Sequence, residues 1–446
     1  MMTQGFSLGL VLPRLRASKS ASIPDFLTIF FLFQILNKTL TILNLLVRAA
    51  GVQDIDTIAL GFGFLTEPTN FYRWQAEWVF FIGTVCFTGG WLVFERRRPL
   101  FVWIEPPPKI LWEGFGVSIL LSTLLKITGM AGNVGMLAEL LRLLPIGALS
   151  VLSGGRSQYG FGQKKAWVVL MALLPLYFLS LQSGVKGEFF LVSMPLLLPI
   201  VRRMSPVRLI GLLVFIMAMV LVVFPISVEI RYANWGPVES RENIGTVEIF
   251  SRLGNKWARD GILEVAMESS AKWLARGASA DIGGLVMQIA DRDGHIGPIL
   301  IDGLQYVFVP RLLWPDKPRF IPGGWFTWYL GQAPSPEEAG TSTAMMLPTE
   351  IYWMFDWAGV FIGMTLIGGL YAWCWKKLIN FSSSSLIALL ALFAFVMRAG
   401  TLEGTHSLYA IAEPIIYLVY VLGLRWLEWS MAWGWTHFSA RRHRYQ

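Results

Sequence analysis

The sequence predicts an all-α polytopic membrane protein with about ten transmembrane helices and one large extracytoplasmic loop module. Of the 446 residues, 54% are hydrophobic and only 15% are charged, whereas an average soluble domain carries about 25% charged residues. Mean hydropathy is +0.54. This composition excludes a soluble globular protein, and the abundance of apolar and aromatic residues also excludes a disordered chain.

Apolar runs close to the length of a bilayer span identify the individual helices. The candidate spans are residues 25–47, 77–94, 110–128, 133–152, 166–182, 188–201, 209–226, 350–374, 384–399 and 407–424. The run at 188–201 is short enough to be re-entrant. The first run lacks a small-residue cleavage site, so we expect it to be a retained span and not a removed signal peptide.

Lysine and arginine in short loops indicate which side of the membrane faces the cytoplasm. The basic clusters all fall on one side of the spans, at residues 14–19, 96–109, 156–165, 202–208, 376–377 and 425–444. Both termini are therefore expected in the cytoplasm. The net charge of +8 reflects this topology, since the long external segment has 11 basic and 14 acidic residues and no nucleic-acid footprint.

Three regions follow from this map: a membrane bundle at 1–226, an extracytoplasmic helical module at 227–346, and a second bundle at 347–446. A connector of this length is too long to be structureless. Apolar residues at helical spacing predict helix over 260–290, and the run at 298–309 is apolar enough to lie in the membrane interface. Cys86 and Cys374 fall in predicted spans, so no disulfide is expected.

Residues 310–324 read PRLLWPDKPRFIPGG, which predicts a rigid, positively charged turn at the membrane surface. Residues 350–352 read EIY and begin the next predicted span, followed by Phe355 and Gly359. Together these motifs resemble those of bacterial O-antigen polymerases, the repeat-unit polymerases of lipid-linked polysaccharide assembly. The motifs cover about 50 residues, and the pattern of many spans with one late external loop covers the chain. The family tends to show Phe-Gly where this chain has Phe355-Asp356, which leaves any role of Asp356 in doubt.

The resemblance implies transfer of a growing glycan from undecaprenyl diphosphate to another lipid-linked repeat unit. A diphosphate leaving group requires cations in a pocket of low dielectric constant. Arg311, Lys317 and Arg319 have this chemistry, although such cations also bind lipid headgroups or cap a turn. Asp316 is either a base or a residue that stabilises the turn.

Charged residues also fall in the outer halves of predicted spans, where they favour a polar cavity that opens outward. Glu139 and Arg142 are three residues apart, so an internal ion pair explains them equally well. Arg398, His406 and Glu413 form a denser group, together with Glu403. The predicted catalytic residues are Arg311, Lys317, Arg276, Arg398, Asp316 and His406; the predicted substrate-binding residues are Arg231, Arg319, Glu350, Tyr352 and Glu413. No metal site and no cofactor are expected.

Several alternatives remain open at this stage. An O-antigen ligase would share the motifs, and a flippase for lipid-linked glycans is the rival from another class. Asp54 and Asp56 favour a polyprenyl-phosphate-sugar glycosyltransferase, while Asp291 and Asp293 form a second, weaker candidate for metal binding. The expected partners are lipid-linked oligosaccharides, membrane lipids, a chain-length regulator and a flippase, but no nucleic acid.

Overall fold

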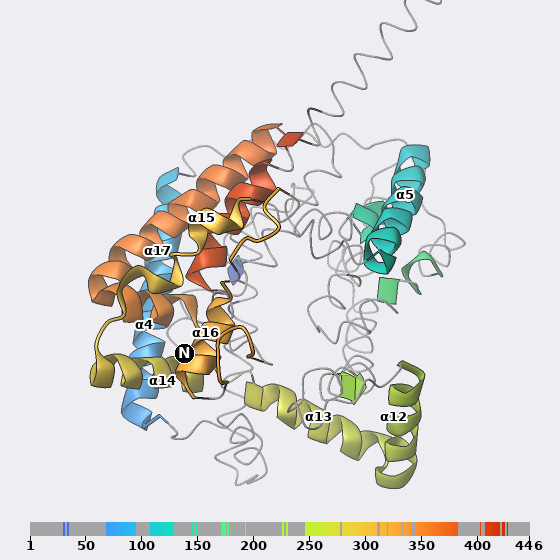
Figure 1. Ribbon diagram of the computed structural model, residues 1–446, viewed down its shortest axis with the longest axis horizontal. Helices are drawn as coiled ribbons and strands as arrows, with labels where there is room; N and C mark the ends of the chain where they lie inside the picture. The colour runs from blue at the N-terminus through green and yellow to red at the C-terminus, as the bar shows by residue number, and fades with distance from the viewer. Residues whose placement is uncertain are drawn as a thin grey trace, which may run out of the picture.

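The structure is a computed structural model, and in the part of the chain that it describes all secondary-structure elements are helices (Figure 1). The described residues are 68–94, 108–128, 246–276, 279–309, 313–318, 320–331, 333–339, 345–381 and 406–419, with short pieces at 30–31, 34, 144–146, 148–149, 171–174, 176–177, 192, 225–226, 229–230, 402, 422–423 and 426. The predicted spans at 209–226 and 384–399 therefore lie almost wholly outside the described residues.

Two described helices are long and apolar enough to cross a membrane, α4 (Asn70–Phe94) and α17 (Leu347–Phe381). They contain the predicted spans 77–94 and 350–374, and both extend beyond them at the N-terminal end. A third helix, α5 (Pro108–Ile127), matches the run at 110–128. The shorter apolar helix Ser407–Val419 coincides with the last predicted span. The prediction of apolar helices is confirmed at these four positions.

Glycines allow α4 and α17 to pack closely along their length. A Cβ atom at Gly90 of α4 would overlap the carbonyl oxygen of Thr365, and one at Gly368 of α17 would overlap the carbonyl oxygen of Phe87. The helix backbones are therefore in contact, as occurs where small residues line a helix interface in a membrane. The interface continues through a hydrophobic core that includes Phe87 and Tyr371, whose rings meet edge to face.

Asp356 divides α17 into two parts. Its backbone has φ 58° and ψ −161°, a conformation that is ordinarily restricted to glycine. In an unbroken helix the carbonyls of Tyr352 and Trp353 would bond to residues 356 and 357. Here they accept hydrogen bonds from His295 Nδ1, at 3.1 and 3.3 Å, and the Trp353 carbonyl also accepts one from the amide of Ile296, at 3.1 Å.

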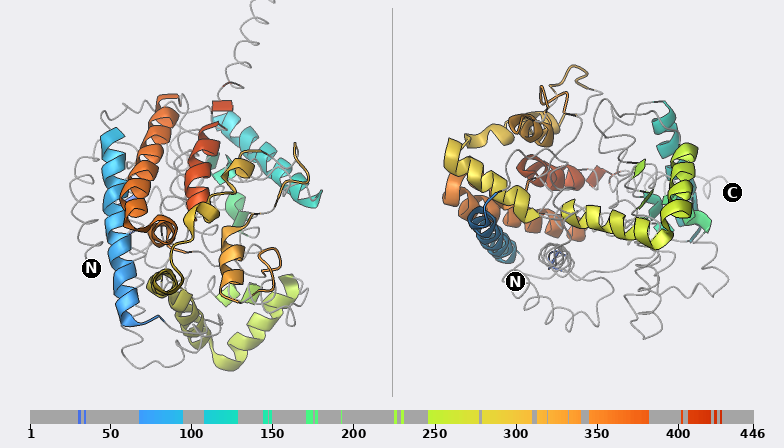
Figure 2. Two further views of the ribbon diagram at one scale, coloured as in Figure 1. Left: turned by 60° about the vertical axis from the view of Figure 1, so that its left-hand side comes forward. Right: turned by 90° about the horizontal axis from the view of Figure 1, so that it is seen from below.

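Helix α14 (Ser279–Asp293) crosses this bundle at the end where α4 begins. Figure 2 shows α14 end-on in the left view, while α4 runs up the page. Arg73 of α4 binds Asp281 of α14 at 2.6 Å, with both side chains about one-fifth exposed. Gly284 brings the α14 backbone against the backbone of Arg73. Helix α14 is thus fixed to the first turns of α4.

Two further helices precede α14 along the chain, and three shorter ones follow it. α12 (Thr246–Asp260) and α13 (Ile262–Arg276) form a pair around Leu253 and Val265, joined at Gly261 with φ 87°. The predicted helix over 260–290 is confirmed, with its run divided between α13 and α14. After α14 come η4 (Gly297–Leu300), α15 (Leu304–Val307) and α16 (Pro322–Tyr329).

Candidate functional site

A buried polar cluster joins the first turn of α17 to the start of the helix Ser407–Val419. Glu350 is completely buried and His406 is 5% exposed. One carboxylate oxygen of Glu350 lies 2.7 Å from His406 Nδ1. The other oxygen accepts a hydrogen bond of 2.9 Å from the Ser407 amide and a second from the Ser407 hydroxyl.

The cluster forms because two helices begin at the same place. Glu350 lies in the first turn of α17, where its amide bonds to the carbonyl of Met346. The amide of Ala410 bonds to the carbonyl of His406, so the second helix starts there. A carboxylate near a helix N-terminus is stabilised by the unpaired amides and by the helix dipole. Glu350 receives this stabilisation from the Ser407 helix and from its own.

The position of Glu350 determines how the histidine ring can act. A carboxylate oxygen pairs with a ring nitrogen that carries a proton. In the tautomer with this proton on Nδ1, the lone pair of the ring is on Nε2. This atom is buried and has no hydrogen-bond partner among the residues that the structure describes. A carboxylate-oriented imidazole with a free Nε2 is the arrangement of a general base.

Two other predicted site residues lie near this cluster. Glu413 is 2% exposed and follows His406 by seven residues, which places both on one face of the helix. Tyr352 is two residues beyond Glu350 in α17, and its ring meets those of His295 and Trp357 at 5.5 Å. The structure therefore brings Glu350 and His406 together, while Glu413 is buried two turns further along the helix of His406. Tyr352 contacts His295 and Trp357.

Lys317 and Asp316 lie in the proline-rich turn, where Lys317 contacts the backbone. The ammonium group of Lys317 donates hydrogen bonds to the carbonyls of Tyr306, at 3.1 Å, and Val309, at 2.8 Å. The Lys317 amide bonds to the carbonyl of Trp314, which closes a turn with Asp316 at its third position. Asp316 is exposed. These contacts favour the structural interpretation of both residues over the catalytic one.

The predicted arginines are not described at the level of their side chains. Arg231, Arg311, Arg319 and Arg398 lie outside the described residues, and so do Asp54 and Asp56. Arg276 ends α13, but its side chain is also outside the description. Their assigned roles stay predictions.

The carboxylates of Asp291 and Asp293 are bonded to two different helices. Asp291 accepts a hydrogen bond of 2.6 Å from Tyr72 of α4, and Asp293 accepts one of 2.8 Å from Tyr329 of α16. The Arg292 guanidinium beside Asp293, with help from Tyr329, lowers the pKa of that carboxyl to about 2. Within the described ranges no group of three potential metal ligands occurs. Asp291 and Asp293 therefore join α14 to α4 and α16.

Sequence reasoning did not identify Ser407 or the break at Asp356 as parts of this arrangement. Ser407 could have been found as a residue typical of a helix start, directly before an apolar run. The departure from Phe-Gly at Asp356 was visible, but its conformation was not. Comparison of the chain with protein families, with curated proteins and with solved structures finds no match.

Proposed function

We propose that the protein is an integral membrane glycosyltransferase that polymerises undecaprenyl-diphosphate-linked oligosaccharide repeat units into a polysaccharide. The observation that carries this proposal is the buried pair of His406 and Glu350, in which Nε2 of the histidine has no hydrogen-bond partner among the described residues. The pair lies at the starts of α17 and of the helix Ser407–Val419, both of them apolar. A base at this position suits an acceptor sugar presented at a membrane surface.

In the proposed reaction His406 takes the proton from the acceptor hydroxyl of one lipid-linked repeat unit. The acceptor oxygen attacks the anomeric carbon of the growing glycan, and the bond from that carbon to the diphosphate oxygen breaks. Undecaprenyl diphosphate leaves with the bonding electrons. The proton stays on His406 Nε2, where the negative charge of Glu350 stabilises the imidazolium, as in other carboxylate–histidine pairs.

The leaving diphosphate needs positive charge, which the proposal assigns to Arg311 first and then to Arg276 and Arg398. Arg231 and Arg319 have the same chemistry and are assigned to substrate binding. Lys317 serves this site indirectly, because its bonds to two carbonyls fix the turn next to Arg311. The reaction uses no metal and no nucleotide sugar in this proposal.

The proposal includes the topology predicted from the sequence. Ten spans cross the bacterial cytoplasmic membrane, both termini are cytoplasmic, and residues 227–346 lie outside. Cysteine labelling in intact cells tests this map. A cysteine at Ser335 should react with an impermeant reagent and one at Ser157 should not, and the reverse pattern would contradict it.

Reconstitution of the purified protein with a lipid-linked repeat unit tests the activity. We expect a ladder of longer glycans and release of one undecaprenyl diphosphate for each bond formed. A single transfer that requires a different acceptor would indicate a ligase. Movement of the lipid-linked unit across the vesicle membrane without a new glycosidic bond would indicate a flippase and overturn the proposal.

A further inference from the structure

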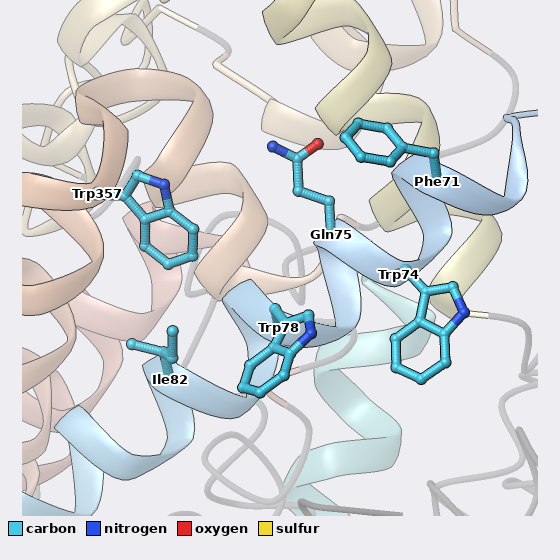
Figure 3. A pocket seen from close by; sticks show the side chains of 6 residues that line it. All are labelled: Phe71, Trp74, Gln75, Trp78, Ile82 and Trp357. Atoms are coloured by element: carbon cyan, nitrogen blue, oxygen red, sulfur yellow. The ribbon is translucent and has the colours of Figure 1, made fainter.

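An open groove runs along α4 beside the first residues of the second part of α17. It has a volume of about 530 Å³ and is lined by Phe71, Trp74, Gln75, Trp78 and Ile82 of α4 and by Trp357 of α17. Figure 3 shows the indole of Trp357 facing Gln75, Trp78 and Ile82 across open space. Apart from the amide of Gln75, the wall is made of aromatic and aliphatic side chains.

The groove is elongated along the helix axis. Its lining residues on α4 recur every three or four positions, which places them along one side of the helix. From Phe71 to Ile82 this stripe covers about 16 Å at 1.5 Å per residue. Both walls belong to helices that are long and apolar enough to cross a membrane. A groove in this direction lies parallel to the hydrocarbon chains of lipids.

Several of the lining side chains are too exposed to be explained by packing within the protein. Phe71 is 68% exposed, Trp74 is 65% exposed and Trp78 is 42% exposed. Large aromatic surfaces of this kind are found where a protein meets a membrane or a ligand. The flat indole faces offer contact area to an apolar chain without forming a specific hydrogen bond to it.

The groove and the proposed base both lie beside the start of α17. A Cβ atom at Gly83, the residue after Ile82, would lie 2.7 Å from Pro348, two residues before Glu350. A substrate whose reacting sugar lies at His406 would have its lipid chain near this wall. We propose that the groove binds the polyprenyl chain of the lipid-linked substrate, an inference that rests on the proposed function. Each isoprene unit carries a methyl branch, which increases its contact with aromatic faces relative to a straight acyl chain.

Turnover of substrates with different lipid chains tests this inference. The full-length protein, reconstituted in vesicles, would be given the same repeat unit on undecaprenyl diphosphate or on dimethylallyl diphosphate, whose single isoprene unit is too short to fill the groove. In the wild type we expect a KM at least tenfold lower for the longer chain. In Trp78→Ala and Trp357→Ala we expect this advantage to be largely lost, since removing one buried indole contact costs roughly a factor of ten or more in affinity.

Trp373→Ala is the matched control for these variants. Trp373 is an exposed tryptophan of α17 that is 43% exposed and does not line the groove. It should keep the wild-type ratio of the two KM values. Equal ratios in the wild type, the control and both groove variants would overturn the inference while the polymerase activity itself remained intact.

Photocrosslinking separates the groove from the proposed activity. An undecaprenyl phosphate with a diazirine in its chain should label residues 71–82, and unlabelled undecaprenyl phosphate should displace it. Excess phosphatidylglycerol should not. Equal displacement by phosphatidylglycerol would show that the groove takes ordinary acyl chains and would overturn the inference. Specific labelling of a protein without any turnover would uphold the groove and contradict the polymerase function alone.

Discussion

The carboxylate of Glu350 lies 2.7 Å from Nδ1 of His406, although 56 residues separate the two along the chain. The contact brings the N-terminal ends of two apolar helices to one point. Glu350 is completely buried, and its second oxygen is bonded to Ser407. A buried carboxylate with this many donors costs little only because its partners are fixed in place. The pair therefore joins α17 to the helix Ser407–Val419, and it also supplies the proposed base.

The backbone conformation of Asp356 leads us to expect an unusual response to substitution. Its φ of 58° and ψ of −161° are accessible to glycine and strained for other residues. We expect Asp356→Gly to keep activity and to raise thermal stability. Asp356→Val should destabilise the protein by about 1–3 kcal/mol, because a β-branched side chain tolerates this conformation worst. Thermal unfolding of the purified variants in detergent measures both effects, and an inactive, well-folded glycine variant would show that the aspartate side chain is itself required.

The close contact of α4 and α17 predicts a contrast between neighbouring glycines. Gly90→Ala and Gly368→Ala place a methyl group against a backbone carbonyl of the facing helix, and overpacking of this kind costs about 1–3 kcal/mol. Gly89→Ala is the control, because a Cβ atom there meets nothing within 4 Å. The midpoint of thermal unfolding should fall for the first two variants only. A similar fall for Gly89→Ala would show that helix flexibility, and not contact, is responsible.

Asp293 predicts a dependence of stability on pH. Its pKa in the folded protein is lowered to about 2 by Arg292 and Tyr329, whereas an unfolded aspartate has a pKa of about 3.9. A lowered folded pKa adds stability above about pH 4, and this stability is lost as the pH falls toward 2. Asp293→Asn should therefore unfold at a lower temperature than the wild type at pH 7, and the difference should shrink below pH 4. A difference that does not change between pH 7 and pH 2.5 would contradict this account.

Chelation provides a test of the proposed metal independence. The carboxylates of Asp291 and Asp293 are bonded to tyrosines of two different helices, and the cationic residues can offset the charge of a diphosphate themselves. Polymerisation of a lipid-linked repeat unit should therefore continue in excess EDTA. Complete loss that is restored by magnesium or manganese would favour the alternative built on Asp54 and Asp56.

Much of the helical structure could be predicted because the relevant signals are local. Long apolar runs predict helix at 77–94 and 350–374, which lie within α4 and α17, and apolar spacing predicts helix over 260–290, where α13 and α14 lie. The break in α17 could not be predicted, since an aspartate in a glycine conformation depends on contacts with His295 and Ile296 from another segment. These contacts are long-range, and no local pattern encodes them.

In the candidate site, too, individual residues could be selected from the sequence but their contacts could not. His406 and Glu413 could be selected from the sequence as polar residues beside or in an apolar span, where burial is costly without a function, and Glu350 through the motif that carries the family resemblance. Their pairing could not be selected, because it depends on how two helices meet. The catalytic role of Lys317 is predicted from its charge and its place in the proline-rich motif, and the sequence could not show its bonds to the carbonyls of Tyr306 and Val309.

The role of His406 is tested most directly by chemical rescue. His406→Ala should lower the polymerisation rate by about a hundredfold to ten-thousandfold, the usual contribution of a positioned general base. Added imidazole should restore part of this rate, because it can occupy the space of the lost ring and accept the proton. Glu350→Gln should lower the rate less, and imidazole should not restore it.

His295→Ala is the control, since this histidine bonds to the carbonyls of Tyr352 and Trp353 and serves the fold. It should lower thermal stability and leave the rate of the folded fraction nearly unchanged. The decisive measurement is the polymerisation rate of purified, folded His406→Ala with and without imidazole. The account predicts a near-inactive variant that imidazole partly rescues, and a wild-type rate from folded His406→Ala without imidazole would contradict it.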